Sequence, residues 1–501
     1  MIIGGLDVGT TGCKLALYHE TGEFVSRLYK EYDVSRINGE HEIDAEAIFA
    51  AVCELIRAAA AKHADLAAIG VTTFGESFVL LGKDDRPLLP AMLYTDPRGG
   101  GETQALCETL GEDALIQIAG VKPHQMYSLP KMMWLKKHRP QIFSQARRVM
   151  LMEDYLIYML TGTAQIDDSL AARTMAFDIR KKCWSGEIFA AAGIAPTLMS
   201  KPVPPGTAAG KIRKSVKDIL GISGDIIVVN GAHDQAAAAV GAGVFAPGQA
   251  VDGTGTVECV TPVFDTIPEN RQLYTEGYSV VPYIGGKYVC YALSYTGGAA
   301  LKWYRDNFAK YESELAKQTG ENVYDVLNSN IKGGPTGLLV LPYFAGAANP
   351  YMDNDAKAVI AGLTLEHTCY DVYRALMEGV TYEIMLNLEH LSRFGITPTQ
   401  LYATGGGAAS DQWLQIKADI LRRPITALDA PEAGACGACM LSALAVGLCG
   451  SLDEARARFV KPKKTFTPAE ENAKIYKAQF EKYKRLYPMM KSIMGDGKDD
   501  N

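Results

Sequence analysis

Short apolar runs alternate with turn residues at the start of the chain. Residues 2–31 contain three such runs, separated by turn residues at 9–12 and 21–22, and this pattern predicts a meander of three strands. Apolar positions then recur on one stripe over residues 44–61, which predicts a helix, and residues 66–73 have the composition of a strand. The alternation of helices and strands predicts an α/β layered fold.

The second half of the chain begins with a similar pattern. Residues 250–260, AVDGTGTVECV, form a strand, a Gly/Thr turn and a strand, much like LDVGTTGCKLAL near the start. Asp7 and Asp252 each close the first strand of their pattern. This similarity favours an internal duplication. The sequence therefore predicts two lobes, residues 1–246 and residues 247–501.

Later segments extend the alternation. A strand over residues 225–231 leads into a helix of small residues, and residues 371–394 carry apolar side chains near every fourth position, as a helix does. The segment ATGGGAASDQW places a glycine turn before a helix that starts near Ser410 or Asp411. We expect the last few residues of the Lys-rich tail to be disordered.

Two uncharged stretches, residues 235–251 and 433–452, are long enough to be considered as membrane spans. Both are rich in Ala and Gly, whose small side chains contribute little transfer free energy, so we expect buried helices instead. The second stretch contains Cys436 and Cys439 in a CxxC spacing. Without a second cysteine pair, this spacing favours helix packing over a metal or redox site.

The overall charge argues against several classes of partner. Lys and Arg total 50 against 57 Asp and Glu, which gives a net charge of −7 without basic runs. Nucleic acid and anionic membranes are therefore not expected partners. The 10 cysteines are scattered along the 501 residues, and the N-terminus lacks the pattern of a signal peptide. We expect a cytoplasmic protein.

The turn after the first strand suits an anion. Backbone N–H groups and hydroxyls of the segment GTTG can face a phosphate, with Asp7 beside them for Mg²⁺. Lys14 could add positive charge at the phosphates. The ordinary alternatives are that Lys14 is a solvated strand lysine and that the segment GTTG is a plain β-turn. Two such turns at corresponding points of two lobes favour a nucleoside triphosphate held between them.

Asp234 lies at a strand-to-helix junction. A hydroxyl that attacks a γ-phosphate needs an acceptor for its proton, and this carboxylate suits the task. We expect the helix dipole to keep Asp234 ionised and so to lower its basicity. The alternative is that Asp234 simply caps the helix. His233 could be a metal ligand, yet no spaced set of His, Cys and Glu completes such a site.

Two stretches point to a known family. Residues 126–138, MYSLPKMMWLKKH, and residues 358–378, AVIAGLTLEHTCYDVYRALME, fit its two signature patterns. Through them, and over nearly its whole length, the chain resembles the FGGY carbohydrate kinases. The resemblance implies two ribonuclease H-like, or actin-like ATPase, lobes with a cleft between them. It also implies ATP and Mg²⁺ in the cleft, a small sugar or polyol held mainly by the first lobe, closure on binding, and a homodimer as one assembly.

The resemblance assigns roles to individual residues. Asp234 matches the catalytic base and Asp7 the residue that holds Mg²⁺ through water. The remaining assignments are Gly9, Thr10, Thr11 and Lys14 for the first phosphate loop, Gly253 and Thr254 for the second, Gly406, Gly407 and Ser410 for the adenosine loop, and Gly75, Glu76, Tyr94, Asp234 and Gln235 for the sugar.

The sugar-binding segment departs from two branches of the family. Gly75 stands where glycerol kinases have arginine, Tyr94 stands where many members have tryptophan, and the Gln-Met-His segment of xylulokinases is missing near Thr73. A xylulose-like pentulose is the substrate that we predict first. Ribulose, erythrulose or erythritol, glycerol and gluconate are alternatives. An ATPase scaffold of the actin or chaperone type, which would ignore sugars, is the alternative of another class.

Overall fold

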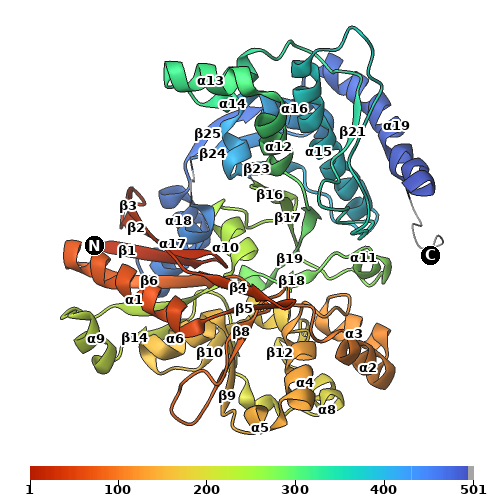
Figure 1. Ribbon diagram of the computed structural model, residues 1–501. Helices are drawn as coiled ribbons and strands as arrows, with labels where there is room; N and C mark the ends of the chain where they lie inside the picture. Colours follow the sequence, from red (N-terminus) through yellow and green to blue (C-terminus); the bar gives the residue numbers. More distant parts are fainter. Residues whose placement is uncertain (430–431, 495–501) are drawn as a thin grey trace.

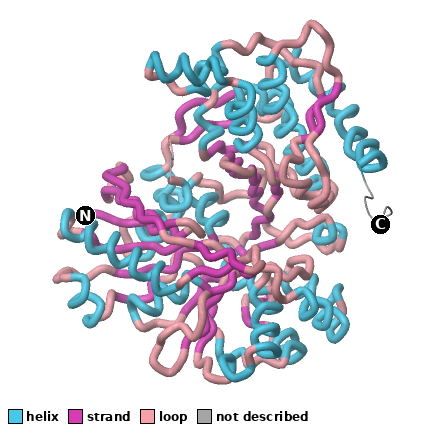
Figure 2. The backbone as a smooth tube through the Cα atoms, viewed as in Figure 1, coloured by secondary structure: helices cyan, strands magenta, loops and turns pink. Residues whose placement is uncertain are grey.

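Two large β-sheets organise the molecule (Figures 1 and 2). The computed structural model describes residues 1–429 and 432–494. One sheet comes from the first half of the chain and lies in the lower lobe of Figure 1, and the other comes from the second half and lies in the upper lobe. The end of the tail, for which disorder is expected, lies outside the described residues.

The first sheet has six strands in the order β14-β15-β6-β1-β2-β3. β1, β6 and β15 are parallel neighbours, while β2, β3 and the edge strand β14 pair antiparallel. The predicted meander of three strands is therefore confirmed. The bounds are β1 Ile2–Val8, β2 Gly12–His19, β3 Phe24–Glu31, β6 Leu66–Thr73, β14 Ala208–Lys211 and β15 Ile227–His233.

The second sheet has eight strands, in the order β18-β19-β17-β16-β23-β24-β25 with β20 also paired to β17. This sheet repeats the arrangement of the first sheet. It contains the hairpin β16–β17, the parallel neighbours β23 and β24, and the antiparallel edge strand β25. This repetition supports the predicted duplication. The bounds are β16 Gln249–Thr254, β17 Glu258–Phe264, β18 Val280–Pro282, β19 Tyr288–Cys290, β20 Ala292–Ser294, β23 Gln400–Thr404, β24 Ile425–Leu428 and β25 Pro462–Phe466.

The remaining strands form small sheets. β4 Val34–Ile37, β5 Glu40–Ile43 and β8 Ala91–Met92 make a three-stranded sheet. The pairs are β7 Phe78–Leu81 with β9 Arg148–Leu151, β10 Gln165–Asp167 with β13 Lys201–Val203, β11 Phe177–Asp178 with β12 Cys183–Trp184, and β21 Leu339–Leu341 with β22 Val359–Ala361.

Helices cover the sheets. The first half contains α1 Ala45–Lys62, α2 Gly100–Leu110, α3 Glu112–Ala119, α4 Ser128–His138, α5 Pro140–Phe143, α6 Met152–Thr161, α7 Asp168–Ala171, α8 Gly186–Ala192, α9 Lys214–Leu220 and α10 Asp234–Gly241. The second half contains α11 Gln272–Thr275, α12 Gly298–Phe308, α13 Lys310–Thr319, α14 Val323–Ser329, α15 Cys369–Ser392, α16 Asp411–Leu421, α17 Ala433–Ala445, α18 Leu452–Phe459 and α19 Glu470–Met494.

Local capping explains where the predicted helices begin. Asp44 caps α1 by accepting hydrogen bonds from two backbone N–H groups of its first turn. Thr368 and Asp371 form a reciprocal capping box at the start of α15. The helices predicted from residues 44–61 and 371–394 are thus confirmed, with their ends within two residues.

The predicted helix over residues 235–251 is wrong in its second half. α10 ends at Gly241, and β16 begins at Gln249. Gly243 takes a positive φ of 69°, and Pro247 lacks the N–H that a continuing helix needs. The other uncharged stretch forms the buried helix α17 over Ala433–Ala445, and its last residues, 446–451, lie outside that helix. Within residues 1–429 and 432–494, no helix has the length and apolar character needed to cross a membrane.

α17 comes late in the chain, yet it packs on the first sheet and on α10, where Figure 1 shows it beside β1. Glycines allow this approach, because a Cβ at Gly5 would lie 1.7 Å from the carbonyl oxygen of Ala435. A Cβ at Gly437 would lie 1.9 Å from that of Ala237. One continuous hydrophobic core therefore runs from the first sheet through α10 and α17 to the second sheet.

Candidate active site

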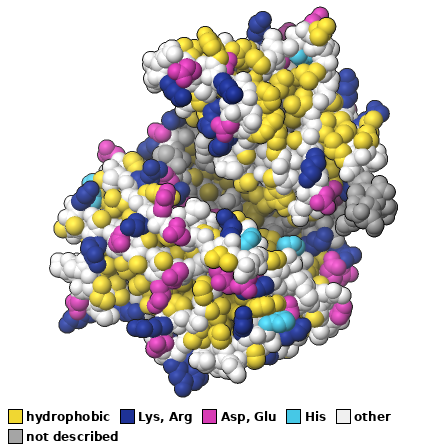
Figure 3. Space-filling view, viewed as in Figure 1, with side chains coloured by type: hydrophobic (Ala, Val, Ile, Leu, Met, Phe, Trp, Pro, Cys, Tyr) yellow, Lys and Arg dark blue, Asp and Glu magenta, His cyan; other side chains and the backbone are white. Residues whose placement is uncertain are grey.

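A hollow separates the two lobes in the space-filling view (Figure 3). The turn after β1, the junction of β15 with α10 and the turn after β16 all lie at the ends of central strands. Val8 at the end of β1 and His233 at the end of β15 both pair with Thr73 of β6, so the first two of these segments lie close together. Their side chains form the candidate active site.

Asp234 is the first residue of α10 rather than its cap, so the capping alternative is wrong. Its Oδ1 accepts a hydrogen bond of 2.6 Å from the N–H of Gln235. Desolvation by the surrounding protein raises the pKa of Asp234 to about 6, although Gln235 and Arg173 oppose the shift. The expectation that the helix dipole lowers the basicity of Asp234 is wrong, because desolvation has the larger effect.

The first phosphate turn carries a compact charge network. Nζ of Lys14 lies 3.3 Å from Oδ2 of Asp7 and 2.8 Å from Oε2 of Glu432, the residue before α17. Arg27 pairs with the other oxygen of Glu432 at 2.5 Å. Lys14 is therefore not a simple solvated lysine. Burial raises the pKa of Asp7 to about 6, and Lys14 opposes this shift.

The turn itself leaves its hydroxyls accessible. Gly9 and Thr10 are half-buried and Thr11 is exposed. The N–H of Gly9 donates to the carbonyl of Gly12 at 3.0 Å, which closes the turn. A Cβ at Gly434 would lie 3.0 Å from Oδ2 of Asp7, so a glycine of α17 keeps the space beside this carboxylate open.

The corresponding aspartate of the second lobe is closed off. Nζ of Lys417, on α16, lies 2.6 Å from Oδ2 of Asp252 and 2.9 Å from Oε1 of Glu258, and all three side chains are buried. The same ammonium donates to Oγ1 of Thr254 at 2.6 Å. Burial raises the pKa of Glu258 to about 8. Lys417 thus anchors the second phosphate turn, and no sequence motif singled it out.

A pocket of about 390 Å³ adjoins this turn. It is lined by Thr254, Gly255, Gly298, Leu301, Asn322, Tyr324, Asp325, Asn328, Tyr373, Gly406, Gly407, Ala409, Ser410 and Trp413. The structure therefore brings together four predicted residues, namely Thr254, Gly406, Gly407 and Ser410. The other predicted residue of the second turn, Gly253, is half-buried on β16 and is not among the lining residues.

Ser410 is held by two contacts. It caps α16 by accepting from the N–H of Trp413 at 3.2 Å, and Asn328 of α14 donates to its hydroxyl at 3.2 Å. A Cβ at Gly407 would lie 2.6 Å from Cβ of Thr254, so this glycine lets the predicted adenosine loop approach Thr254 closely. Asn328 and its neighbours on α14 escaped sequence reasoning because that helix carries no motif.

The predicted sugar residues lie on the first lobe's side. Glu76 is buried with a positive φ of 66°, and its Oε1 accepts from Nε of Arg173 at 2.7 Å and from Nη2 of the same arginine. Tyr94 is 40 % exposed, and Gln235 is half-buried beside Asp234. Arg173, which sequence reasoning missed, therefore already neutralises part of the Glu76 carboxylate.

Gly75 has no side chain because another residue occupies its space. A Cβ there would lie 3.0 Å from Cδ2 of His233 and 3.1 Å from Cγ of Arg173. A side chain at this position would therefore crowd both Arg173 and the histidine that precedes Asp234.

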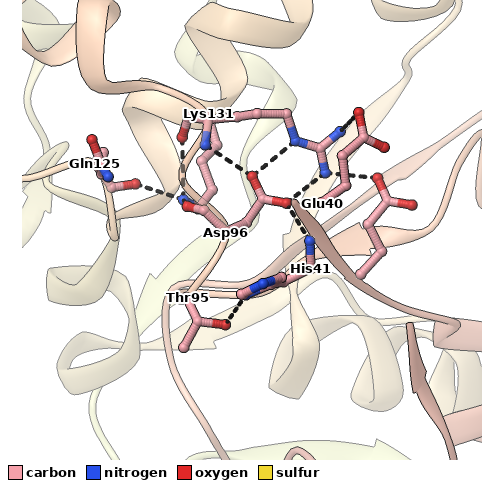
Figure 4. Close-up of polar contacts among 8 residues, drawn as sticks. Glu40, His41, Thr95, Asp96, Gln125 and Lys131 are labelled. Carbon is pink, nitrogen blue, oxygen red and sulfur yellow. Dashed lines mark hydrogen bonds and ion pairs between the residues drawn. The ribbon is translucent and has the colours of Figure 1, made fainter. Parts of the chain in front are cut away.

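The loop that carries Tyr94 is tied down by a buried lysine (Figure 4). Nζ of Lys131 donates to the carbonyls of Asp96 at 2.7 Å and of Gln125 at 2.6 Å. The carboxylate of Asp96 accepts from the N–H of His41 at 2.7 Å. Burial lowers the pKa of Lys131 to about 8. The lysine of the segment 126–138 thus positions a loop of the candidate site.

Comparisons with known proteins cover most of the chain. Residues 2–241 match the sequence model of the FGGY family of carbohydrate kinases, N-terminal domain, and residues 257–446 match that of the C-terminal domain. The chain is 27% identical to a xylulose kinase of Staphylococcus xylosus over 96% of its length and 99% of the relative's. It is 28% identical to a gluconokinase of Bacillus subtilis, covering 94% and 93%.

A solved structure is similar throughout. The ligand-bound xylulose kinase from Lactobacillus acidophilus superposes with a TM-score of 0.88 at 26% identity, covering 99% of each chain. The expected α/β fold with two actin-like lobes is thereby confirmed.

Replacing Lys417 by Met tests its anchoring role. The variant leaves Asp252 buried without a counter-charge, so we expect the free energy of unfolding to fall by about 3–5 kcal/mol. Urea-induced unfolding measures the change. Lys464→Met is the matched control. Lys464 pairs with Asp411, which lies on α16 as Lys417 does, but this ion pair is exposed and should contribute less than about 1 kcal/mol. Equal losses in both variants would contradict the role.

Proposed function

The chain belongs to the FGGY family of carbohydrate kinases, and from that membership we propose that it transfers the γ-phosphate of ATP to a primary hydroxyl of a ketose or polyol. The observation that carries the proposal is the position of Asp234. This carboxylate follows β15, whose last residue pairs with Thr73 of β6, and the same Thr73 pairs with Val8, the neighbour of Asp7. A proton acceptor beside a phosphate-binding turn is the arrangement that phosphoryl transfer to a hydroxyl requires.

Asp234 would take the proton of the attacking hydroxyl. With a pKa raised to about 6, the carboxylate is a better base than an exposed aspartate and is still ionised at neutral pH. The transition state of phosphoryl transfer is loose, so alignment of the hydroxyl is the larger part of the task. We propose that Gln235, Glu76, Gly75 and Tyr94 form the sugar site that supplies this alignment.

We propose that ATP binds with its adenosine in the pocket of about 390 Å³. Aromatic and aliphatic side chains line it together with Gly406, Gly407 and Ser410, which suits a flat base and a ribose. Thr254, which also lines this pocket, would bind phosphate with its hydroxyl. Gly9, Thr10, Thr11 and Lys14 would bind the phosphates from the opposite lobe.

The residues present also fit Mg²⁺. Within residues 1–429 and 432–494, no group of three or more His, Cys, Asp or Glu side chains could hold a metal by itself. Mg²⁺ commonly keeps several waters and takes one or two carboxylates plus substrate phosphates. Asp7 provides such a carboxylate, with the space beside it kept open by Gly434. When bound, Mg²⁺ would neutralise phosphate charge.

A xylulose-like pentulose is the substrate that we propose first. Xylulose kinases of Staphylococcus xylosus and Bacillus subtilis are 27% and 28% identical to the chain over nearly all of its length. A gluconokinase at 28% identity keeps gluconate as the second candidate.

We also propose a domain boundary, a cellular location and an assembly. We divide the chain at residue 246, although α17 and α18 of the second part pack with the first sheet. A reducing cytoplasm suits the ten cysteines, which are all free thiols. A homodimer is the proposed assembly.

A sugar panel tests the function. ADP release should depend on an added sugar, be fastest with xylulose and be slow with glycerol. The panel comprises xylulose, ribulose, erythrulose, erythritol, glycerol and gluconate, each with ATP and Mg²⁺. ADP release that is the same with and without every sugar would favour the scaffold ATPase instead, and a maximum with gluconate would replace the proposed pentulose.

Asp234→Asn tests the base. The amide cannot accept the proton but keeps the size of the side chain, so kcat should fall by about 100-fold to 10,000-fold while ATP affinity changes little. Steady-state kinetics and nucleotide titration measure the two quantities. Asp225→Asn is a control, because this aspartate is an exposed partner of Lys211 and Lys217. Near-normal turnover of Asp234→Asn would refute the assignment.

The raised pKa of Asp234 predicts a pH profile. A general base must be ionised, so kcat/KM for the sugar should be constant above a pH of about 6 and fall about tenfold per unit below it. ATP affinity measured over the same range separates the contribution of Asp7, whose pKa is also raised to about 6. A profile that stays flat below that pH contradicts Asp234 as the titrating base.

A further inference from the structure

The carboxylate of Asp234 is held through one of its two oxygens. Oδ1 accepts from the N–H of Gln235 at 2.6 Å, and Nε2 of His233 lies 3.3 Å from the same oxygen. Asp234 keeps 37 % of its side-chain surface exposed, whereas His233 keeps only 8 %. Because both contacts fall on Oδ1, Oδ2 is the oxygen that can face a substrate hydroxyl.

His233 is itself held from the other lobe. Its Nδ1 lies 2.9 Å from the hydroxyl of Tyr291, and the two rings are tilted by 38° with centroids 5.5 Å apart. Tyr291 is buried between β19 and β20 of the second sheet, while His233 ends β15 of the first. The backbone N–H of His233 donates to Oγ of Ser169 at 2.9 Å. The residue is therefore held by hydrogen bonds at its backbone N–H and at Nδ1, and its Nε2 faces Asp234.

The chemistry of the three groups sets the direction of the hydrogen bonds. Burial lowers the pKa of His233 to about 3, so the ring is neutral, with one nitrogen donating and the other accepting. Burial also raises the pKa of Tyr291 far above its usual range, so its hydroxyl stays protonated. An ionised carboxylate only accepts, and Nε2 therefore carries the hydrogen. Tyr291 therefore donates to Nδ1, and Nε2–H faces Oδ1 of Asp234 at an N···O distance of 3.3 Å.

We propose that His233 is a positioning residue that aligns Oδ2 of Asp234 with the substrate hydroxyl, and that Tyr291 sets its tautomer from the second lobe. This inference rests on the proposed function, because it takes Asp234 as the base. It also accounts for Gly75, since any side chain there would meet the imidazole at about the closest tolerated distance. Alignment of the base then depends on the relative position of the two lobes.

Four variants test the proposal. His233→Leu removes the donor, His233→Gln keeps an N–H donor in place of Nε2, Tyr291→Phe removes the hydroxyl, and a double variant combines His233→Leu with Tyr291→Phe. The rate of phosphoryl transfer is measured in single turnovers by rapid quench, so that product release does not mask the chemical step. Xylulose is the probe, or the sugar of the panel that is phosphorylated fastest.

We expect His233→Leu to slow the chemical step by about 100-fold, because a misplacement of about 1 Å has an effect of that size. His233→Gln should recover part of the loss. Tyr291→Phe should slow the step by about tenfold, the order of effect of one hydrogen bond. The double variant should be no slower than His233→Leu, because the two residues act in series. KM for ATP should stay constant throughout.

A matched control separates positioning from packing. Tyr283 is another buried tyrosine of the second lobe, and its hydroxyl donates to the carbonyl of Val244 at 2.8 Å. Tyr283→Phe should therefore leave the chemical step unchanged. Thermal unfolding shows which variants fold. If His233→Leu does not fold, the rates of His233→Gln and Tyr291→Phe are compared with that of Tyr283→Phe, and this comparison tests the positioning role.

Several results would overturn the inference. They are a folded His233→Leu with a wild-type rate, losses that multiply in the double variant, and equal losses in Tyr291→Phe and Tyr283→Phe. An inactive Asp234→Asn beside a normal His233→Leu removes only this inference. A normal Asp234→Asn removes the proposed base itself.

Discussion

The contact between α17 and α10 is the constraint on which the site depends. Their backbones touch at Gly437 and Gly241, where an added Cβ would lie 1.9 Å and 2.0 Å from a carbonyl oxygen. α10 begins with Asp234, and Glu432 precedes α17 beside Lys14. One packed pair of helices therefore holds Asp234 and the charge network around Lys14 in a common frame. A side chain at either glycine would separate the helices and displace both groups.

The two lobes repeat a topology but use their matching aspartates differently. Asp7 keeps part of its surface exposed. Its partner Lys14 also pairs with Glu432, which lies far away along the chain. Asp252 is fully buried against Lys417, whose ammonium also holds Thr254. A buried charge needs a partner, because its desolvation is costly, and the pair then serves as a rigid support. Only the aspartate that stays accessible is suited to a hydrated metal ion.

Particular residues show which features of the structure local sequence can predict. The strands, the glycine turns and the helix starts at Asp44 and near Ser410 follow from periodicity and capping, which act over a few residues. Asp234 and Thr254 were identified because they belong to such local patterns. The basicity of Asp234 was predicted in the wrong direction, since a helix start is a local feature whereas desolvation depends on everything packed around the side chain.

The sequence by itself determined the two-lobed α/β architecture, the family and the two Gly/Thr turns, because each depends on contiguous residues. Only the tertiary structure decided the partners: Glu432 for Lys14, Arg173 for Glu76, Lys417 for Thr254 and Tyr291 for His233. Each pair joins positions that lie far apart along the chain. Such contacts leave no periodic trace in a single sequence, and they arise only when strands, helices and the glycines between them bring separate segments to hydrogen-bonding distance.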